Sequence, residues 1–349
     1  MGYKEEALDF LGITKWHKLG YTGSGIKIMS IEPVSSKKKF PNVIAVNGYN
    51  EGNLREQSHG DRVMEQMMDI APNATFITCS KEGNTDNWKP LYLDYILNNN
   101  VQLFTSSKLS DVYKLSSTTE KYMQECIDNG TTFFIGAGNR KTFGGKDIYP
   151  EAKSDKYLAI GACEFNDGEV GKAFYSCEGE ELDYMTIVGH DGESGTSFAT
   201  NRFCAMCALV QQLFLEKAGR TLYRHELVRF IDDNVMDLKT EGFDIYTGHG
   251  LFILPDPTTI KTSDYITDTN VGDIDYSGFP IPKEEEPMKV VLTIDNHIVD
   301  INGEAKLYDV APFIKHSRTF VPVQFLRDVG FNVEWNEATR QVIITKWGE

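Results

Sequence analysis

The chain has 349 residues, 41% of them hydrophobic, and its formal net charge is -16. This length allows about two domains of ordinary size, each with a buried core. A negative charge of this magnitude repels the phosphates of nucleic acids and the anionic surfaces of membranes, so we expect no nucleic-acid partner.

At the N-terminus, Glu5 and Glu6 stand where a secretory signal peptide would carry basic residues, and no continuous apolar segment follows them. No other segment approaches the roughly 18 apolar residues of a membrane-spanning helix. We therefore expect a cytoplasmic protein without membrane insertion. Export by a non-classical route would leave no sign in the sequence.

From Gly25 to about Pro255, short apolar segments rich in β-branched and aromatic residues alternate with segments of helical period. The predicted strands cover residues 26–31, 73–80, 101–106, 131–138 and 156–163. The predicted helices cover residues 61–71, 91–100, 116–130 and 197–219. Strands that alternate with helices indicate an α/β domain built on a mostly parallel sheet.

Residues 258–287 are rich in proline, threonine and acidic residues and have no sustained periodicity, which predicts a linker between domains at 1–257 and 288–349. In the second domain we predict two strand pairs and one helix, at residues 289–303, 333–347 and 321–330 respectively. This arrangement is a small α+β module near the lower size limit for independent folding.

The six cysteines lie scattered inside apolar stretches, at Cys79, Cys126, Cys163, Cys177, Cys204 and Cys207. Cys204 and Cys207 have the spacing of a redox or zinc motif, but no second pair accompanies them. We therefore predict reduced thiols that pack in the core.

Ser197 opens a helical segment directly after Gly192 and Gly195. At a helix N-terminus, the free backbone N–H groups and the positive end of the helix dipole stabilise an oxyanion. Small neighbouring residues let a substrate backbone approach closely. The stretch therefore has the properties of an acyl-transfer nucleophile, and the alternative is an ordinary helix-capping serine.

A nucleophilic serine needs a base, and His59 is the best candidate among the seven histidines because it opens a predicted helix directly after a loop. Glu32 follows the strand at 26–31 and supplies a carboxylate that can orient the imidazole. Asn139 follows the strand at 131–138 and can donate a side-chain N–H to an oxyanion. The carboxyl ends of parallel strands lie at one edge of a sheet, where sites form in open α/β folds.

The order Glu32, His59, Asn139 and Ser197 resembles that of the subtilisin-like serine peptidases, or subtilases, with Gly-Thr-Ser-Phe-Ala-Thr at the serine, His-Gly at the histidine and Ala-Gly-Asn at the asparagine. The resemblance extends over about residues 13–257. It implies the subtilisin fold and the hydrolysis of peptide bonds through an acyl-enzyme on Ser197. His59 would be the general base and then the acid, and Glu32 would replace the usual aspartate.

The resemblance also implies that Asn139 and the backbone N–H of Ser197 form the oxyanion hole. The substrate main chain would bind as an added strand along residues 101–107, at Leu103, Phe104, Thr105, Ser106 and Ser107. The chemistry requires no cofactor. Structural calcium is common in the family, but no EF-hand loop occurs in this sequence, so a calcium ion is left open.

Three positions depart from the subtilase pattern. Glu-Pro-Val at 32–34 replaces Asp-Thr/Ser-Gly, and the extra methylene of Glu32 displaces the carboxylate by about 1 Å, which can cost about 100-fold in rate. Asp61 replaces the small residue after His-Gly; it could raise the pKa of His59 or substitute for Glu32, but we expect it to point into solvent. Asn201 stands where a proline is usual.

Residues 288–349 resemble the copper amine oxidase N-terminal-like, or stalk, domain through DING at 300–303, APFI at 311–314, RTFVPVQFL at 318–326 and VEWNEATRQVII at 333–344. The module lacks the active site of the oxidase, so the resemblance implies no copper chemistry. Such modules usually accompany surface or secreted bacterial proteins. We therefore expect a protein or cell-surface partner for this domain.

Two functions follow from these observations. In the first, the chain is an active serine endopeptidase; in the second, it is a pseudoprotease that keeps the fold and binds peptides or assembles with other proteins. Retention of Ser197, His59 and Asn139 favours the first, and Glu32 favours the second. An esterase of the α/β-hydrolase type would need Gly-x-Ser-x-Gly, where Ala199 replaces the last glycine. We predict the peptidase, because Glu32 still carries the required charge.

Overall fold

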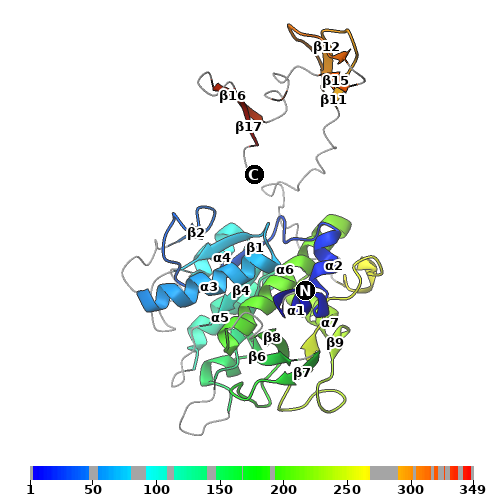
Figure 1. Ribbon diagram of the computed structural model, residues 1–349. Coiled ribbons are helices and arrows are strands. Elements are labelled where there is room, and N and C mark those ends of the chain that lie inside the picture. Colours follow the sequence, from blue (N-terminus) through cyan, green and yellow to red (C-terminus); the bar gives the residue numbers. More distant parts are fainter. Residues whose placement is uncertain are drawn as a thin grey trace. The chain divides into compact units, whose positions relative to one another are not determined.

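The computed structural model divides the chain into two compact units, Met1–Ile281 and Pro282–Glu349 (Figure 1). In the first unit it describes residues 3–46, 54–79, 92–107, 114–139, 147–166, 168–188 and 193–267. In the second it describes residues 290–301, 304–315, 318–320, 326, 331–336 and 341–346.

The first unit is built on one sheet, whose ten described strands follow the order β2-β3-β1-β4-β5-β6-β8-β10-β9, with β7 paired to β6. The pairs from β2 to β10 are parallel, and only β7 and β9 run antiparallel to their described neighbours. The strands are β1 Lys27–Ser30, β2 Ile44–Ala45, β3 Thr75–Thr78, β4 Leu103–Ser106, β5 Thr132–Gly136, β6 Tyr157–Asn166, β7 Glu169–Lys172, β8 Tyr184–Val188, β9 Val235–Met236 and β10 Leu251–Phe252. The predicted mostly parallel sheet is confirmed.

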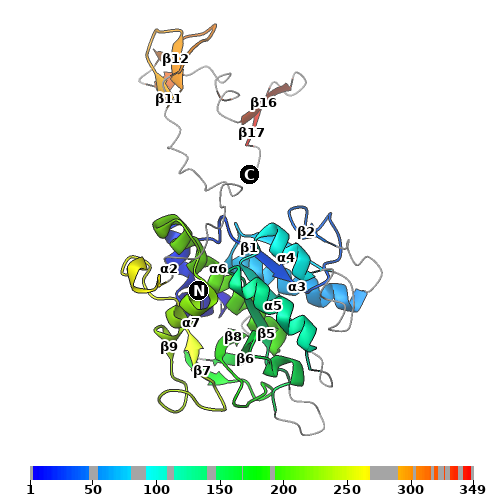
Figure 2. The same ribbon diagram turned by 180° about the vertical axis from the view of Figure 1, so that it is seen from behind.

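Helices cover both faces of this sheet. Helices α3 and α6 pack against one another on one face, whereas α4 and α5 lie on the other (Figures 1 and 2). The helices are α1 Tyr3–Phe10, α2 Ile13–Lys18, α3 Leu54–Ile70, α4 Asp94–Asn99, α5 Ser117–Asp128, α6 Thr196–Ala218 and α7 Arg224–Asp232. Two 3₁₀ turns, Pro150–Lys153 and Thr262–Asp264, complete the described elements.

Helix α6 is the centre of the core. Every residue from Thr196 to Leu215 is buried except Ser197. A helix that is buried on all sides must be enclosed by other elements, and α6 contacts α3 as well as strands β1, β4, β5, β6 and β8. It ends at Gly219, whose φ of 78° suits a residue without a Cβ atom. The burial of α6 therefore fixes the position of the one accessible serine at its start.

In the second unit the described residues form three small antiparallel groups of strands. β11 Val290–Leu292, β12 Ile298–Ile301 and β13 Glu304–Leu307 form one sheet; β14 Phe313–Lys315 pairs with β15 Arg318–Phe320, and β16 Phe331–Asn336 pairs with β17 Gln341–Lys346. The two strand pairs predicted at 289–303 and 333–347 are confirmed. Of the helix predicted at 321–330, only Leu326 is described, and it is helical.

The first unit extends beyond the boundary predicted at residue 257. The ring of Tyr265 lies 5.0 Å from that of Phe230 in α7, and the backbone N–H of Thr267 donates to Glu226 at 2.7 Å. An aromatic side chain and a buried carboxylate therefore hold the start of the predicted linker against α7. The rest of that linker, residues 268–287, lies outside the described residues.

Candidate active site

The sequence-predicted residues meet at one edge of the sheet. Glu32 follows β1 and Asn139 follows β5, so both lie beyond the carboxyl ends of parallel strands. Strand β1 lies between β3 and β4, at the point where the strand order reverses. Open α/β sheets place their sites at such a point. Ser197, in the first turn of α6, reaches the same edge.

A continuous chain of hydrogen bonds joins Ser197, His59 and Glu32. The hydroxyl of Ser197 lies 3.0 Å from Nε2 of His59, and Nδ1 of His59 lies 2.9 Å from Oε2 of Glu32. Because the carboxylate only accepts, Nδ1–H is the donor to Glu32, and Nε2 is left to accept from the serine hydroxyl. The ring of His59 also packs against Phe198, with ring centroids 5.1 Å apart.

Glu32 is 2% exposed and is held by few polar contacts. Its Oε2 binds His59, but its Oε1 has no hydrogen-bond partner among the described residues. Its backbone carbonyl accepts from the hydroxyl of Thr78. The position of this carboxylate therefore depends on one side-chain hydrogen bond and on the path of the backbone that carries it.

The electrostatic environment raises the pKa of His59 above the 6.5 of an unperturbed imidazole. Burial alone would lower this pKa, but the hydrogen bond to Glu32 and the charge of Glu32 outweigh that effect. Arg62 lowers the pKa of His59 and Glu193 raises it, and these two side chains form an ion pair with one another. The imidazolium form of His59 is thus stabilised mainly by Glu32.

Two N–H groups beside the hydroxyl of Ser197 are available to a ligand: the side-chain amide of Asn139 and the backbone N–H of Ser197. Gly195 precedes α6 with a φ of 127°, a conformation that favours glycine, and a Cβ atom there would lie 3.3 Å from Oγ of Ser197. Oδ1 of Asn139 accepts from the backbone N–H of Thr196 at 2.9 Å, which leaves Nδ2 of Asn139 without an acceptor among the described residues. The backbone N–H of Ser197 likewise has none there. Both groups can therefore donate to an added oxyanion.

Two neighbours that the sequence did not single out support this helix start. The hydroxyl of Tyr175 accepts from the backbone N–H of Gly195 at 2.9 Å, and burial raises the pKa of Tyr175 to about 12. Thr196 accepts from the backbone N–H of Gly138 through its hydroxyl at 3.1 Å. These contacts join the start of α6 to the loops after β5 and β7, and no motif in the sequence indicates them.

Asn201, one turn after Ser197, ties the same region to β4 and β1. Its Nδ2 donates to the carbonyl of Ser197 at 2.7 Å and to the hydroxyl of Ser107 at 2.6 Å. Its Oδ1 accepts from the hydroxyl of Ser30 at 3.1 Å. A proline at position 201 could make none of these hydrogen bonds.

The structure corrects two expectations about the helix that carries His59. His59 does not open a helix; it lies inside α3, which begins at Leu54. Asp61 does not point into solvent: it is 7% exposed, and its carboxylate accepts from the backbone N–H and hydroxyl of Ser35. These oxygens are occupied by Ser35 and Lys39, so Glu32 and not Asp61 receives the Nδ1–H of His59.

The structure also corrects the predicted substrate-binding strand. Leu103, Phe104 and Thr105 pair with β1 on one side and with β5 on the other. A strand with two neighbours has no free edge, so these three residues cannot pair with an added peptide. The pairing with β1 ends at Thr105. Of the five predicted substrate-binding residues, Ser106 and Ser107 lie beyond this pairing.

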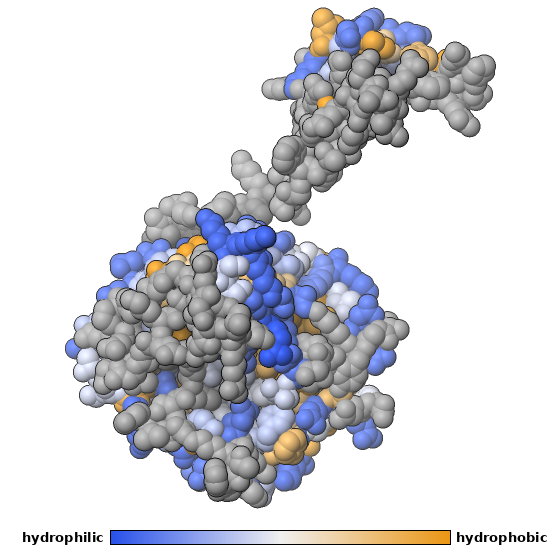
Figure 3. Space-filling view, turned by 60° about the vertical axis from the view of Figure 1, so that its left-hand side comes forward, coloured by the Kyte–Doolittle hydropathy of each residue, from blue (hydrophilic) through white to orange (hydrophobic). Residues whose placement is uncertain are grey.

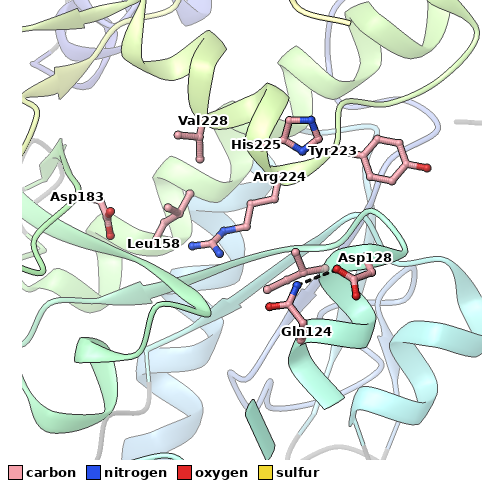
Figure 4. Close-up of a pocket in the computed structure, with 9 residues that line it drawn as sticks. Gln124, Asp128, Leu158, Asp183, Tyr223, Arg224, His225 and Val228 are labelled. Atoms are coloured by element: carbon pink, nitrogen blue, oxygen red, sulfur yellow. Dashed lines mark hydrogen bonds between the residues drawn. The ribbon is translucent and has the colours of Figure 1, made fainter. Parts of the chain in front are cut away.

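A separate cavity of about 630 Å³ lies at the opposite edge of the sheet (Figure 4). Leu158 is near the start of β6 and Asp183 directly precedes β8, so the cavity is at the amino ends of these strands. Its lining residues are Gln124, Ile127, Asp128, Leu158, Asp183, Tyr223, Arg224, His225 and Val228. In Figure 4 Arg224 extends from α7 toward Leu158 and Asp183, whose pKa burial raises to about 6. The described residues that line this cavity include no serine or cysteine beside His225, so the cavity is not the candidate site.

The described residues also bear on the predictions for the cysteines, for membrane insertion and for metal binding. All six cysteines are buried and unbridged, and burial raises the pKa of Cys204 and Cys207 well above the usual range, which confirms core packing. None of the described helices is both long and apolar enough to cross a membrane. The described residues include no group of three or more His, Cys, Asp or Glu side chains that could hold a metal ion.

Comparison with known proteins supports the fold. No curated protein sequence matches the chain. Similar solved structures include a lanthipeptide protease, with 16% identity and a TM-score of 0.55 over 71% of this chain and 92% of that chain. MycP1 from Mycobacterium smegmatis has 16% identity and a TM-score of 0.54, covering 77% of this chain and 88% of its own.

Fervidolysin from Fervidobacterium pennivorans, a keratinolytic enzyme related to subtilisin, has 15% identity and a TM-score of 0.56, covering 71% of this chain and 44% of its own. Residues 284–344 match the family described as the copper amine oxidase N-terminal domain. Identities of this size establish the fold alone. The first unit therefore has the fold of the subtilisin-like proteases, and the second matches the copper amine oxidase N-terminal domain family.

Proposed function

We propose that the first unit is a serine endopeptidase that hydrolyses peptide bonds through an acyl-enzyme on Ser197. The observation that carries this proposal is the continuous chain of hydrogen bonds from Ser197 through His59 to the buried carboxylate of Glu32, with distances of 3.0 and 2.9 Å. A serine that merely capped a helix would need neither an imidazole at its hydroxyl nor a carboxylate behind that imidazole.

In the first half of the reaction, Oγ of Ser197 attacks the carbonyl carbon of the scissile bond while Nε2 of His59 takes the hydroxyl proton. Glu32 stabilises the imidazolium that forms. Nδ2 of Asn139 and the backbone N–H of Ser197 donate to the oxyanion of the tetrahedral intermediate. The imidazolium then gives its proton to the leaving amine as the C–N bond breaks, which leaves the acyl-enzyme.

In the second half, His59 takes a proton from water as the water oxygen attacks the acyl carbon, and it returns that proton to Oγ of Ser197 when the ester bond breaks. No cofactor enters either half. The substrate main chain runs beside Ser106 and Ser107, where the pairing with β1 has ended. The substrate class is therefore an extended peptide or an unfolded segment of a protein.

Digestion of an unfolded protein such as casein by the full chain tests this function directly. We expect casein fragments from the parent chain and none from Ser197→Ala at the same concentration. A Ser197→Ala chain that digests casein at the parent rate would overturn the assignment of Ser197 as nucleophile.

The second candidate is a pseudoprotease that binds peptides without cleaving them. Glu32 favours it, because glutamate departs from the subtilase pattern and its Oε1 is buried without a hydrogen-bond partner among the described residues. In that case an unfolded peptide would bind the full chain and be recovered intact. Recovery of cleaved peptide from the parent chain but not from Ser197→Ala would exclude this candidate.

For the second unit we propose a protein or cell-surface partner. Six large apolar side chains are exposed on its described residues, at Ile294, Ile298, Leu307, Val310, Phe313 and Ile314. Figure 3 shows exposed hydrophobic residues of this unit in orange. Exposed apolar groups of this kind are typical of interaction surfaces.

A further inference from the structure

Three consecutive residues of α3 contact the segment 32–35, which carries Glu32. His59 binds the carboxylate of Glu32 at 2.9 Å. The next residue, Gly60, lies so close to Pro33 that a Cβ atom would be 2.0 Å from its carbonyl oxygen. The residue after that, Asp61, accepts hydrogen bonds from Ser35. Three successive residues of α3 therefore each contact a residue of the segment 32–35.

Asp61 joins α3 to this segment and to Lys39 through three hydrogen bonds. Its Oδ1 accepts from the backbone N–H of Ser35 at 2.8 Å, and its Oδ2 accepts from the hydroxyl of Ser35 at 2.7 Å. Lys39 donates to the same Oδ2 at 3.0 Å. Hydrogen bonds to a buried carboxylate are stronger than those between neutral groups, so they hold the backbone of Ser35 against α3.

Glu32 needs this support because its own side chain is weakly held. Oε2 binds only His59 among the described residues, and Oε1 has no partner. A glutamate carboxylate also lies about 1 Å farther from its Cα atom than that of the usual aspartate. The backbone of Glu32 must therefore lie correspondingly farther from His59 for the carboxylate to meet Nδ1. That position is set by the contacts of α3 with Pro33 and Ser35.

We propose that Asp61 is a positioning residue of the hydrolytic site, which holds Ser35 so that the longer carboxylate of Glu32 meets Nδ1 of His59. This inference rests on the proposed function and deepens it. Asp61 itself does not touch the substrate or the reacting atoms; it acts through the segment 32–35. The departure from the subtilase pattern at residue 61 thereby compensates for the departure at residue 32.

The test measures the pKa of His59 in the full chain with Ser197→Ala, by NMR of the imidazole protons, with His59→Gln to assign the signal. This readout needs no catalytic activity. Asp61→Asn should lower the pKa of His59 toward the value in Glu32→Gln, because the carboxylate moves away from Nδ1. In the chain with Ser197 intact, Asp61→Asn should slow labelling by a fluorophosphonate about 10- to 100-fold.

Glu65→Gln is the matched control. Glu65 forms the other ion pair of Lys39, at 2.9 Å, so this variant removes a neighbouring charge without touching the hydrogen bonds between Asp61 and Ser35. It should leave the pKa of His59 and the labelling rate unchanged. A pKa shift in Glu65→Gln as large as in Asp61→Asn would overturn the proposal, because the effect would then be one of charge and not of position.

A double variant separates positioning from general loss of structure. If Asp61 acts through Glu32, Asp61→Asn should not change the pKa of His59 further once Glu32→Gln is present. Additive shifts would overturn the proposal. If Asp61→Asn does not fold, Ser35→Ala takes its place; it removes only the hydroxyl contact and should shift the pKa of His59 in the same direction, and no shift would contradict the proposal.

Failure of this proposal and failure of the proposed function give different results. A pKa of His59 that falls in Asp61→Asn, in a chain that is never labelled at Ser197, supports the positioning role and refutes the hydrolytic function. Labelling at Ser197 together with an unchanged pKa of His59 in Asp61→Asn supports the function and refutes the positioning role.

Discussion

Glu32 decides how the imidazole of His59 behaves. It is 2% exposed, and it binds Nδ1 of His59 through Oε2, while Oε1 has no partner in the part of the chain that the structure describes. A carboxylate in this position fixes the tautomer of the imidazole and stabilises its charged form. The substitution of glutamate for aspartate therefore preserves the charge and the contact, and it changes the backbone position that the contact requires.

Replacing Glu32 tests this role. Glu32→Gln should slow the labelling of Ser197 by at least about 100-fold, because a neutral amide cannot stabilise the imidazolium and can present the wrong group to Nδ1. Thermal unfolding should change little, since the amide keeps the volume of the side chain. Labelling at the parent rate in Glu32→Gln would mean that the carboxylate has no part in activating Ser197.

The pH dependence of labelling follows from the raised pKa of His59. His59 must be neutral to accept the proton of Ser197, so labelling should fall as the pH drops through its pKa, which lies above 6.5. Glu32→Gln removes the cause that raises this pKa, so the fall should move to lower pH. The check is the labelling rate measured from pH 5 to pH 9; an unmoved profile in the variant contradicts the assignment.

At the scale of elements, α6 joins the core to the site. Its residues from Thr196 to Leu215 are buried apart from Ser197, and Asn201 ties its first turn to Ser107 and Ser30. The helix can therefore shift Ser197 only if the core or these hydrogen bonds change. The position of Ser197 therefore depends on a helix that is buried from Thr196 to Leu215.

Asn201→Ala should loosen this attachment. It leaves the buried hydroxyl of Ser30 without its acceptor, which costs about 1–3 kcal/mol of unfolding free energy. It also removes one donor from the carbonyl of Ser197, which keeps the hydroxyl of Ser107. Chemical denaturation of the full chain measures this loss, and labelling of Ser197 should also slow.

The control is Asn129→Ala, because Nδ2 of Asn129 donates to the carbonyl of Glu125 at 2.8 Å in an exposed position. An exposed contact of this kind should change the unfolding free energy by no more than about 0.5 kcal/mol. Equal losses of unfolding free energy in the two variants would show that the buried hydrogen bonds of Asn201 stabilise the fold no more than an exposed contact does.

The motifs around Ser197, His59 and Asn139 predicted the candidate site because each lies within a few residues of a recognisable strand or helix. The environment of Asp61 could not be predicted, because it depends on the fold of the loop that brings Ser35 to α3. The error at Leu103–Thr105 has a similar cause: the chain order does not reveal that β4 lies between β1 and β5.

Several elements were absent from the predicted set for a simpler reason. β8 is a buried apolar segment of five residues, Tyr184–Val188, and such a segment is too short to assign by periodicity alone. Helix α7, Arg224–Asp232, has only nine residues. Its Phe230 packs on Phe214 of α6 and on Tyr265, and these contacts between distant parts of the chain cannot be read from a short sequence segment.

At the scale of the whole molecule, the chain consists of two units with separate cores. Met1–Ile281 is organised around α6, and the described residues of Pro282–Glu349 bury Val299, Ile301 and Val333. Each unit thus has its own buried apolar groups. The residues of the candidate site, Glu32, His59, Asn139 and Ser197, all belong to the first unit.

The two units should therefore fold separately. We expect residues 282–349, produced alone, to show a cooperative thermal transition, and residues 1–281 to be labelled at Ser197 as fast as the full chain. Calorimetry and labelling rates check these two outcomes. A disordered second unit, or a first unit that loses labelling once residues 282–349 are removed, would contradict the division.

The most direct test of the central proposal is the labelling of the intact chain with a fluorophosphonate, followed by mass spectrometry of its peptides. We predict a single modified residue, Ser197, and no modification in Ser197→Ala or His59→Gln. Absence of labelling in a chain shown to be folded would contradict the proposal that Ser197 is an activated nucleophile, and would leave peptide binding as the function of the site.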